Sequence, residues 1–271
     1  MTNAETDPKQ MLRSALTLAR GQEPAAHDEL LLSLQSLEFL ERLDSPAEYQ
    51  MASKYRLRVT QILEALARNP APTARHVLVE LTASDVFLAH DERIIVLIRA
   101  SVFLRPPAPP VVDFWDRHSQ PDDGFTPTTI PVLVENGSPP ALNLLESKLA
   151  DPAHEDQDKI SWFRTTILCH RNDLELLLMC ERALGHGLPA SLRPALVEVL
   201  FDYRPEEWFR PVSSYSPPPL ANASTAALLR LQQLGFYALQ SVNLDSNQRQ
   251  AVGVRLREAQ AELAARPQPP P

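Results

Sequence analysis

The sequence predicts an all-helical protein, from two counts of residue type and one pattern. Its 271 residues include only 7 glycines but 26 prolines, whereas average usage gives about 19 and about 14. Sheet hairpins and phosphate-binding loops depend on glycine, and proline favours the first turn of a helix. Between the prolines, apolar residues recur at helical spacing. The chain is therefore expected to fold as many short helices.

The first 70 residues predict helices that begin and end at recognisable caps. Asp7-Pro8 supplies a side-chain cap and a proline at the first helical position, and Gly21 ends that helix. A capping box at residues 45–48 begins a later helix, which stops before Asn69-Pro70. The helices expected here are residues 8–20, 28–43 and 46–68.

The middle of the chain predicts helices at residues 72–81 and 91–104, with a shorter helix or turn at 111–118. The segment Ile94–Ile98 is apolar and partly β-branched, so it also suits a buried strand. A helix is preferred because no partner strand with hairpin chemistry lies nearby.

From residue 126 onward, prolines and capping residues again mark out short helices, and two longer helices end the chain. The expected helices are residues 127–135, 140–149, 156–169, 173–184, 189–201, 221–239 and 245–266. Residues 267–271, which include several prolines, are expected to be a disordered tail.

Two segments of the chain resemble each other. Pro140-Ala141-Leu142 and Pro194-Ala195-Leu196 each begin an apolar stripe that is followed by Leu, Asp and then a proline. This pattern resembles the second helix of HEAT-like repeats. The resemblance implies an irregular α-solenoid of stacked helix pairs over residues 71–266, with the helices of residues 1–70 packed on it. The uneven spacing leaves an irregular multi-helix bundle as the alternative.

Charge and cysteine use narrow the functional classes. A net charge of -8 opposes phosphate binding, so no nucleic-acid partner is expected. The two cysteines cannot form a disulfide framework, and the first residues do not resemble a secretory signal. The apolar stretches are too short to cross a bilayer. We therefore expect a cytoplasmic protein without membrane insertion.

An acidic cluster around Trp115 is the candidate for chemistry, and it consists of Asp113, Asp116, His118, Asp122 and Asp123. Two carboxylates at i,i+3 share a helix face, and together with the imidazole they could hold a divalent cation. A solvated turn whose aspartates cap helix ends explains the same residues and is preferred. Cys169-His170 and Cys180 lack zinc-ligand spacing, so we expect Cys180 to pack in the core.

The segment at residues 203–219 is the candidate partner-binding site. It combines aromatic and arginine side chains, the residue types that dominate interface hot spots. A loop whose aromatic residues plug the end of the core is the competing interpretation. The residues concerned are Tyr203, Arg204, Trp208, Phe209, Arg210 and Tyr215.

No nucleophile elbow, Walker loop, dinucleotide fingerprint or metalloprotease motif occurs in the chain. We therefore expect a non-enzymatic protein-binding or scaffold protein without a cofactor, acting as a subunit or accessory of a larger assembly. The alternative is an enzyme or enzyme accessory with a groove site at Asp113, Asp116 and His118.

Overall fold

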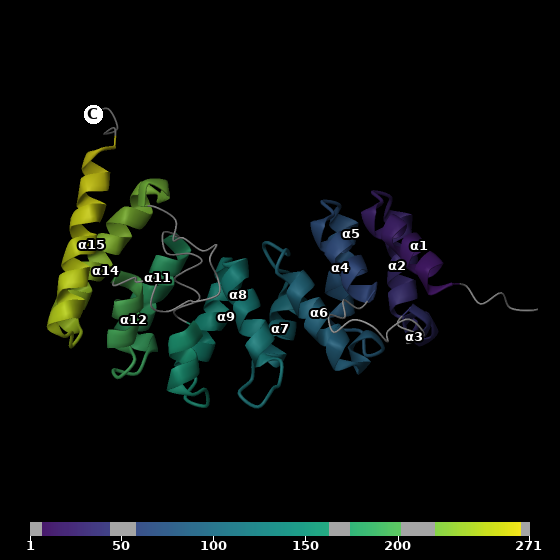
Figure 1. The fold of residues 1–271 in the computed structure, drawn as a ribbon, viewed down its shortest axis with the longest axis horizontal. Helices are drawn as coiled ribbons and strands as arrows, with labels where there is room; N and C mark the ends of the chain where they lie inside the picture. Colours follow the sequence, from purple (N-terminus) through teal and green to yellow (C-terminus); the bar gives the residue numbers. More distant parts are fainter. Residues whose placement is uncertain (1–6, 44–57, 163–173, 202–219, 267–271) are drawn as a thin grey trace, which may run out of the picture. The chain divides into compact units, whose positions relative to one another are not determined.

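The computed structural model describes residues 7–43, 58–162, 174–201 and 220–266, and every regular element in these ranges is a helix (Figure 1). The all-helical prediction is thereby confirmed. The chain divides into two compact units, Met1–Val132 and Leu133–Pro271. Among the helices of the described ranges, none is both long and apolar enough to cross a membrane.

The first unit is built from short helices, several of which begin at proline or at a side-chain cap. Asp7 caps the first helix by accepting a hydrogen bond from the Lys9 amide at 3.0 Å. Proline occupies the first turn of α1, α2, α5 and α7, where its missing N–H costs no helical hydrogen bond. The helices are α1 (Pro8–Arg20), α2 (Pro24–Leu34), α3 (Leu37–Leu43), α4 (Arg58–Arg68), α5 (Pro72–Leu81), α6 (Asp91–Ser101) and α7 (Pro109–Arg117).

The helix expected at residues 28–43 is two helices in the structure, which corrects the prediction. The chain turns at Gln35-Ser36, and Ser36 Oγ accepts the Phe39 amide of α3 at 3.4 Å. The first of the two helices also begins earlier than expected, at Pro24, where no side chain caps it.

In the first unit, helices pack within pairs and also between neighbouring pairs. α1 packs on α2, and α4 packs on α5. α1 also packs on α4, and α2 packs on α5. Helices on both sides of residue 70 therefore share one unit. Further along, Trp115 of α7 is fully buried and donates its indole N–H to Ser101 Oγ of α6 at 2.7 Å.

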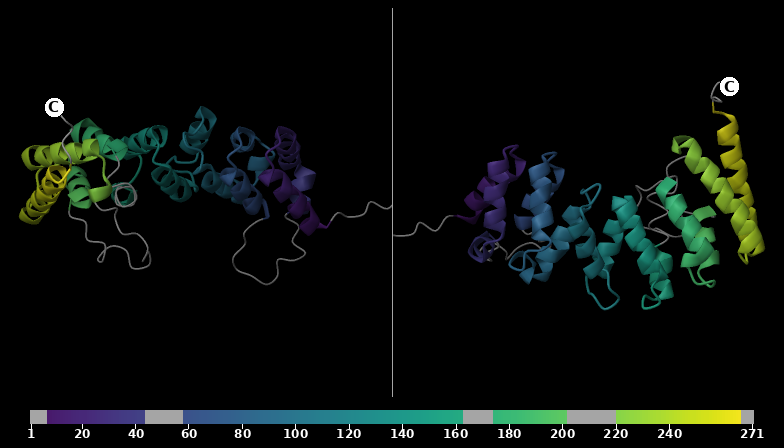
Figure 2. Two further views of the ribbon diagram at one scale, coloured as in Figure 1. Left: turned by 90° about the horizontal axis from the view of Figure 1, so that it is seen from above. Right: turned by 180° about the vertical axis from the view of Figure 1, so that it is seen from behind.

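α8 (Thr126–Asn136) contains the division, and the second unit continues from it to the C-terminal helices. α11 packs on α14 and α12 packs on α15, while α14 and α15 lie side by side (Figure 2). The remaining bounds are α9 (Pro139–Ala150), α11 (Leu174–Arg182), a π-helical turn (Ala183–Gly187), α12 (Arg193–Phe201), α14 (Thr225–Ser241) and α15 (Ser246–Ala264).

A glycine allows α14 and α15 to pack closely against each other. A Cβ added at Gly235 of α14 would lie 2.7 Å from Leu256 Cδ2 of α15. The start of α15 is fixed by a capping box between Asp245 and Gln248. Glycine therefore serves here as a packing residue inside a helix.

Candidate functional site

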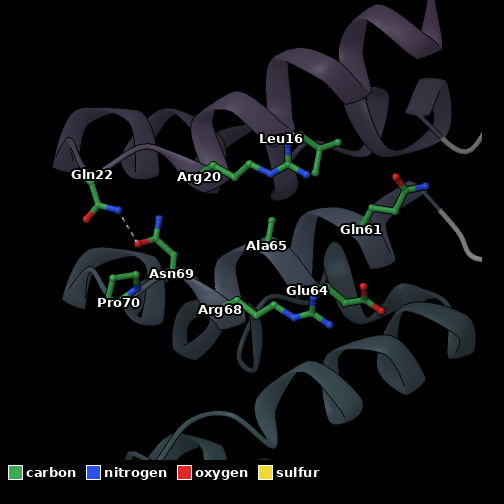
Figure 3. A pocket seen from close by; sticks show the side chains of 9 residues that line it. All are labelled: Leu16, Arg20, Gln22, Gln61, Glu64, Ala65, Arg68, Asn69 and Pro70. Atoms are coloured by element: carbon green, nitrogen blue, oxygen red, sulfur yellow. Dashed lines mark hydrogen bonds between the residues drawn. The ribbon is translucent and has the colours of Figure 1, made fainter.

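A pocket of about 520 Å³ lies between α1 and α4 in the first unit (Figure 3). Pockets of this size accommodate small molecules or a few side chains of a peptide. Most of its lining is polar or charged. The lining residues are Leu16, Arg20, Gln22, Gln61, Glu64, Ala65, Arg68, Asn69 and Pro70.

Helical periodicity explains why these side chains meet. Leu16 and Arg20 are spaced i,i+4, so they share one face of α1. Gln61, Ala65 and Arg68 occupy one face of α4, because they are spaced i,i+4 and then i,i+3. The opposite faces of both helices are buried in the core, so the lining faces are left toward solvent. Leu16 and Ala65, both half-buried, form the apolar part of the pocket.

Two arginines give the pocket its positive charge. Figure 3 shows Arg20 on one wall and Arg68 on the other, with Ala65 between them. Both are exposed, and among the described residues neither guanidinium has a hydrogen bond or an ion pair. The whole of α1 has three basic residues and no acidic one. This surface is therefore cationic on a chain whose net charge is -8.

Asn69 closes one end of the pocket and joins the two helix pairs. Its Nδ2 donates to the carbonyls of Ala19 at 2.8 Å and Gly21 at 2.7 Å. Its Oδ1 accepts from the Ala71 amide at 2.9 Å and from Gln22 Nε2 at 3.3 Å. The last carbonyls of a helix have no partner within it. A single buried side chain thus satisfies the end of α1 and the start of α5.

His27 of α2 extends this polar joint into the core. The side chain is fully buried, with Nδ1 2.6 Å from Thr73 Oγ1 and Nε2 3.4 Å from Asn69 Nδ2. The two hydrogens of Asn69 Nδ2 are already directed at the Ala19 and Gly21 carbonyls, so its contact with His27 Nε2 is longer and weaker than those two bonds. The His27 ring therefore links α2 to Thr73 in the first turn of α5.

The structure does not bring the acidic cluster together as a metal site. Asp113 and Asp116 are exposed on α7, whereas His118 Nδ1 pairs with Asp123 Oδ2 at 3.1 Å. Within the described residues, no three His, Cys, Asp or Glu side chains form a group that could hold a metal ion.

The His118 side chain instead connects α7 to the loop that contains Asp123 and Phe125. Its ring meets the edges of Phe114 and Phe125, with ring centroids 4.8 and 5.1 Å away. Asp123 Oδ1 also accepts the Phe125 amide at 2.8 Å, as a turn-capping aspartate does. These contacts give His118 and Asp123 a packing and capping role.

Cys180 is fully buried, and burial raises the pKa of its thiol from 9.0 to about 12. Burial disfavours the thiolate, which is the nucleophilic and metal-binding form, and the buried position agrees with the core role expected from the sequence. The neighbouring candidates Cys169 and His170 lie outside the described residues. So does the whole predicted partner-binding segment, Tyr203, Arg204, Trp208, Phe209, Arg210 and Tyr215.

The α1–α4 pocket was not predicted from the sequence. The one local sequence feature that relates to the pocket is that residues 8–20 contain three basic residues and no acidic residue. Nothing local indicates that residues 61–68 supply the other wall, because the contact joins segments more than forty residues apart.

No family model matches the chain, and no curated protein or solved structure gives a significant match to it.

Proposed function

We propose that the chain is a non-enzymatic protein-binding or scaffold protein, acting as a subunit or accessory of a larger assembly. The observation that carries this proposal is the pocket between α1 and α4. Its lining has no cysteine, histidine, serine or aspartate, so it lacks the pairing of nucleophile and base that covalent catalysis uses. It presents exposed arginines beside an apolar floor, a composition typical of interface hot spots.

The proposed architecture is a HEAT-like stack of helix pairs. The stacking of α1 on α4 and of α2 on α5 supports it, because corresponding helices of neighbouring pairs then pack on each other. In the second unit, α11 packs on α14 and α12 packs on α15, which is the same relation between neighbouring helix pairs. The two segments that carry the sequence resemblance lie in α9 and α12.

The proposal keeps the aromatic segment as a second contact with the partner. Its support is composition alone, namely Trp208 and Phe209 flanked by Arg204 and Arg210. We further propose a cytoplasmic setting, from the sparse use of cysteine, and a protein rather than a nucleic-acid partner, from the net charge of -8.

Affinity capture of the tagged full chain from its native cells, quantified by mass spectrometry, tests the proposal. We expect a protein that co-purifies in stoichiometric amount. Three double variants run beside the wild type: Arg20→Gln/Arg68→Gln in the pocket, Trp208→Ala/Phe209→Ala in the aromatic segment, and the control Arg75→Gln/Arg99→Gln. Arg75 and Arg99 are also exposed arginines of the first unit, but they lie outside the pocket.

A partner retained by the control and lost by either of the other two variants supports the binding role and locates the contact. A chain that is recovered alone, and that runs as a monomer in size-exclusion chromatography with light scattering, refutes it.

A further inference from the structure

We propose that the α1–α4 pocket recognises carboxylate side chains of an acidic peptide segment. The inference rests on the proposed protein-binding function and specifies the chemistry of the partner. It starts from two guanidinium groups, Arg20 and Arg68, that face one pocket from separate helices.

The arginines are available to a ligand. Neither has a hydrogen bond or ion pair with a described residue, while Glu64, the acidic residue of the lining, has an interaction of its own. Two other arginines of the described residues do pair closely with a carboxylate, Arg182 with Glu146 at 2.8 Å and Arg230 with Glu181 at 2.6 Å. The pocket arginines therefore retain their full capacity for pairing.

The shape of the pocket suits a glutamate or aspartate side chain. A guanidinium presents parallel N–H donors that match both oxygens of a carboxylate. Ala65 lies between the two arginines and Leu16 lies beside Arg20 on α1, so both can contact the methylene groups of the incoming side chain. Gln22 and Gln61 add amide groups that can bond to a peptide backbone. A volume of about 520 Å³ leaves room for more than one side chain.

Charge favours a peptide over a polyphosphate. The chain as a whole carries -8, and Glu64 adds a negative charge to the lining itself. Nucleic-acid affinity grows with the number of phosphates that are neutralised. Two arginines within an acidic protein neutralise few phosphates, but they are sufficient to pair with one or two carboxylates.

A peptide array tests the inference with the whole 271-residue chain. The probes are octapeptides that carry two glutamates or aspartates at varied spacing in a Leu/Ala/Ser background, and each has a twin with glutamine or asparagine in those places. We expect the wild type to bind a subset of the acidic probes and none of the twins.

Variants then locate the binding. Arg20→Gln/Arg68→Gln should weaken binding to the selected probes at least tenfold, and Arg20→Lys/Arg68→Lys should weaken it less, because the charge remains but the fork is lost. The control Arg75→Gln/Arg99→Gln, which changes the net charge equally, should bind as the wild type does. Circular dichroism and the unfolding midpoint verify that each variant is folded.

The inference is overturned if no acidic probe binds, if the glutamine twins bind equally well, or if the control loses as much affinity as the pocket variant. It is also overturned if a single-stranded DNA oligonucleotide binds more tightly than the best peptide with the same dependence on Arg20 and Arg68. A native partner that is captured regardless of these two arginines leaves the binding function standing and refutes only the carboxylate chemistry. If the chain binds acidic peptides selectively but captures no native partner, the carboxylate chemistry stands and the proposed binding function is refuted.

Discussion

Replacing Asn69 tests how the first two helix pairs are joined. Asn69→Ala removes hydrogen bonds to Ala19, Gly21, Ala71 and Gln22, of which the first three lie between 2.7 and 2.9 Å. At about 0.5–1.5 kcal/mol for each of these three, and little for the longer Gln22 bond, the loss is about 2–4 kcal/mol of unfolding free energy. The Ala19 carbonyl would remain buried without this partner, which favours the upper part of that range.

A nearly isosteric change separates hydrogen bonding from packing. Asn69→Asp keeps the shape but replaces the donor Nδ2 by an oxygen that faces two carbonyl oxygens. We expect it to destabilise the first unit at least as much as Asn69→Ala does, although it leaves no cavity. Gln22→Ala is the matched control, because this exposed side chain lines the same pocket and loses one bond of 3.3 Å. It should change stability by less than about 0.5 kcal/mol.

Hydrogen exchange with mass spectrometry measures the effect where it arises. Amides of α1 and α4 should exchange about 30-fold faster or more in both Asn69 variants, since about 1.4 kcal/mol corresponds to a factor of ten. Peptides from α14 and α15, which belong to the other unit, should be unchanged. Exchange in α1 that stays within threefold of the wild type in Asn69→Asp would refute the role assigned to this side chain.

Three further perturbations test packing and protonation elsewhere. Gly235→Ala places a methyl group against Leu256, 2.7 Å from its Cδ2, and should cost about 1–3 kcal/mol in urea unfolding; an unchanged midpoint would show that the helices can separate freely. Ser101→Ala leaves the buried Trp115 N–H without its acceptor and should cost about 1–3 kcal/mol, and a loss under 0.5 kcal/mol would contradict this. Burial raises the pKa of Cys180 from 9.0 to about 12, so the folded state holds this proton longer and stability should fall between those pH values. The decrease of stability with pH should be smaller in Cys180→Ala. An equal decrease in this variant would contradict the assignment of the pH dependence to Cys180.

Controls are available for two of these changes. Gly185→Ala adds the same methyl group at a position where nothing lies within 4 Å, so it should be nearly neutral. For the pH series, Cys169→Ala removes the other cysteine of the chain. The fall in stability that Cys180 causes should persist in that variant.

Much of the secondary structure could be predicted, because its signals are local. Asp7-Pro8 and Gly21 bound α1 as expected, and the apolar centre at Ile94–Ile98 lies in the helix α6 rather than in a strand. The break at Gln35-Ser36 was missed, because neither residue prevents a helix from continuing. Its only local mark is the Ser36 hydroxyl that bonds to the Phe39 amide.

The candidate site could not be predicted in the same way. In the sequence, nothing distinguishes Arg20 and Arg68 from the other arginines. Each is the last residue of its helix, α1 or α4. They share a pocket only because α1 packs on α4. At His118 the sequence was more informative, because its acidic neighbours favoured a capping turn over a metal site. In the structure His118 contacts Asp123 and the rings of Phe114 and Phe125.

The Asn69 joint has a kinetic consequence for any ligand of the pocket. Apolar helix contacts have little directional preference, whereas hydrogen bonds to three backbone groups fix both the distance and the angle between the turns at the ends of α1 and α4. The walls therefore keep their spacing when the pocket is empty. Association then needs little reorganisation of the backbone and loses little conformational entropy. Differences in affinity among ligands should appear in their dissociation rates, while their association rates remain similar.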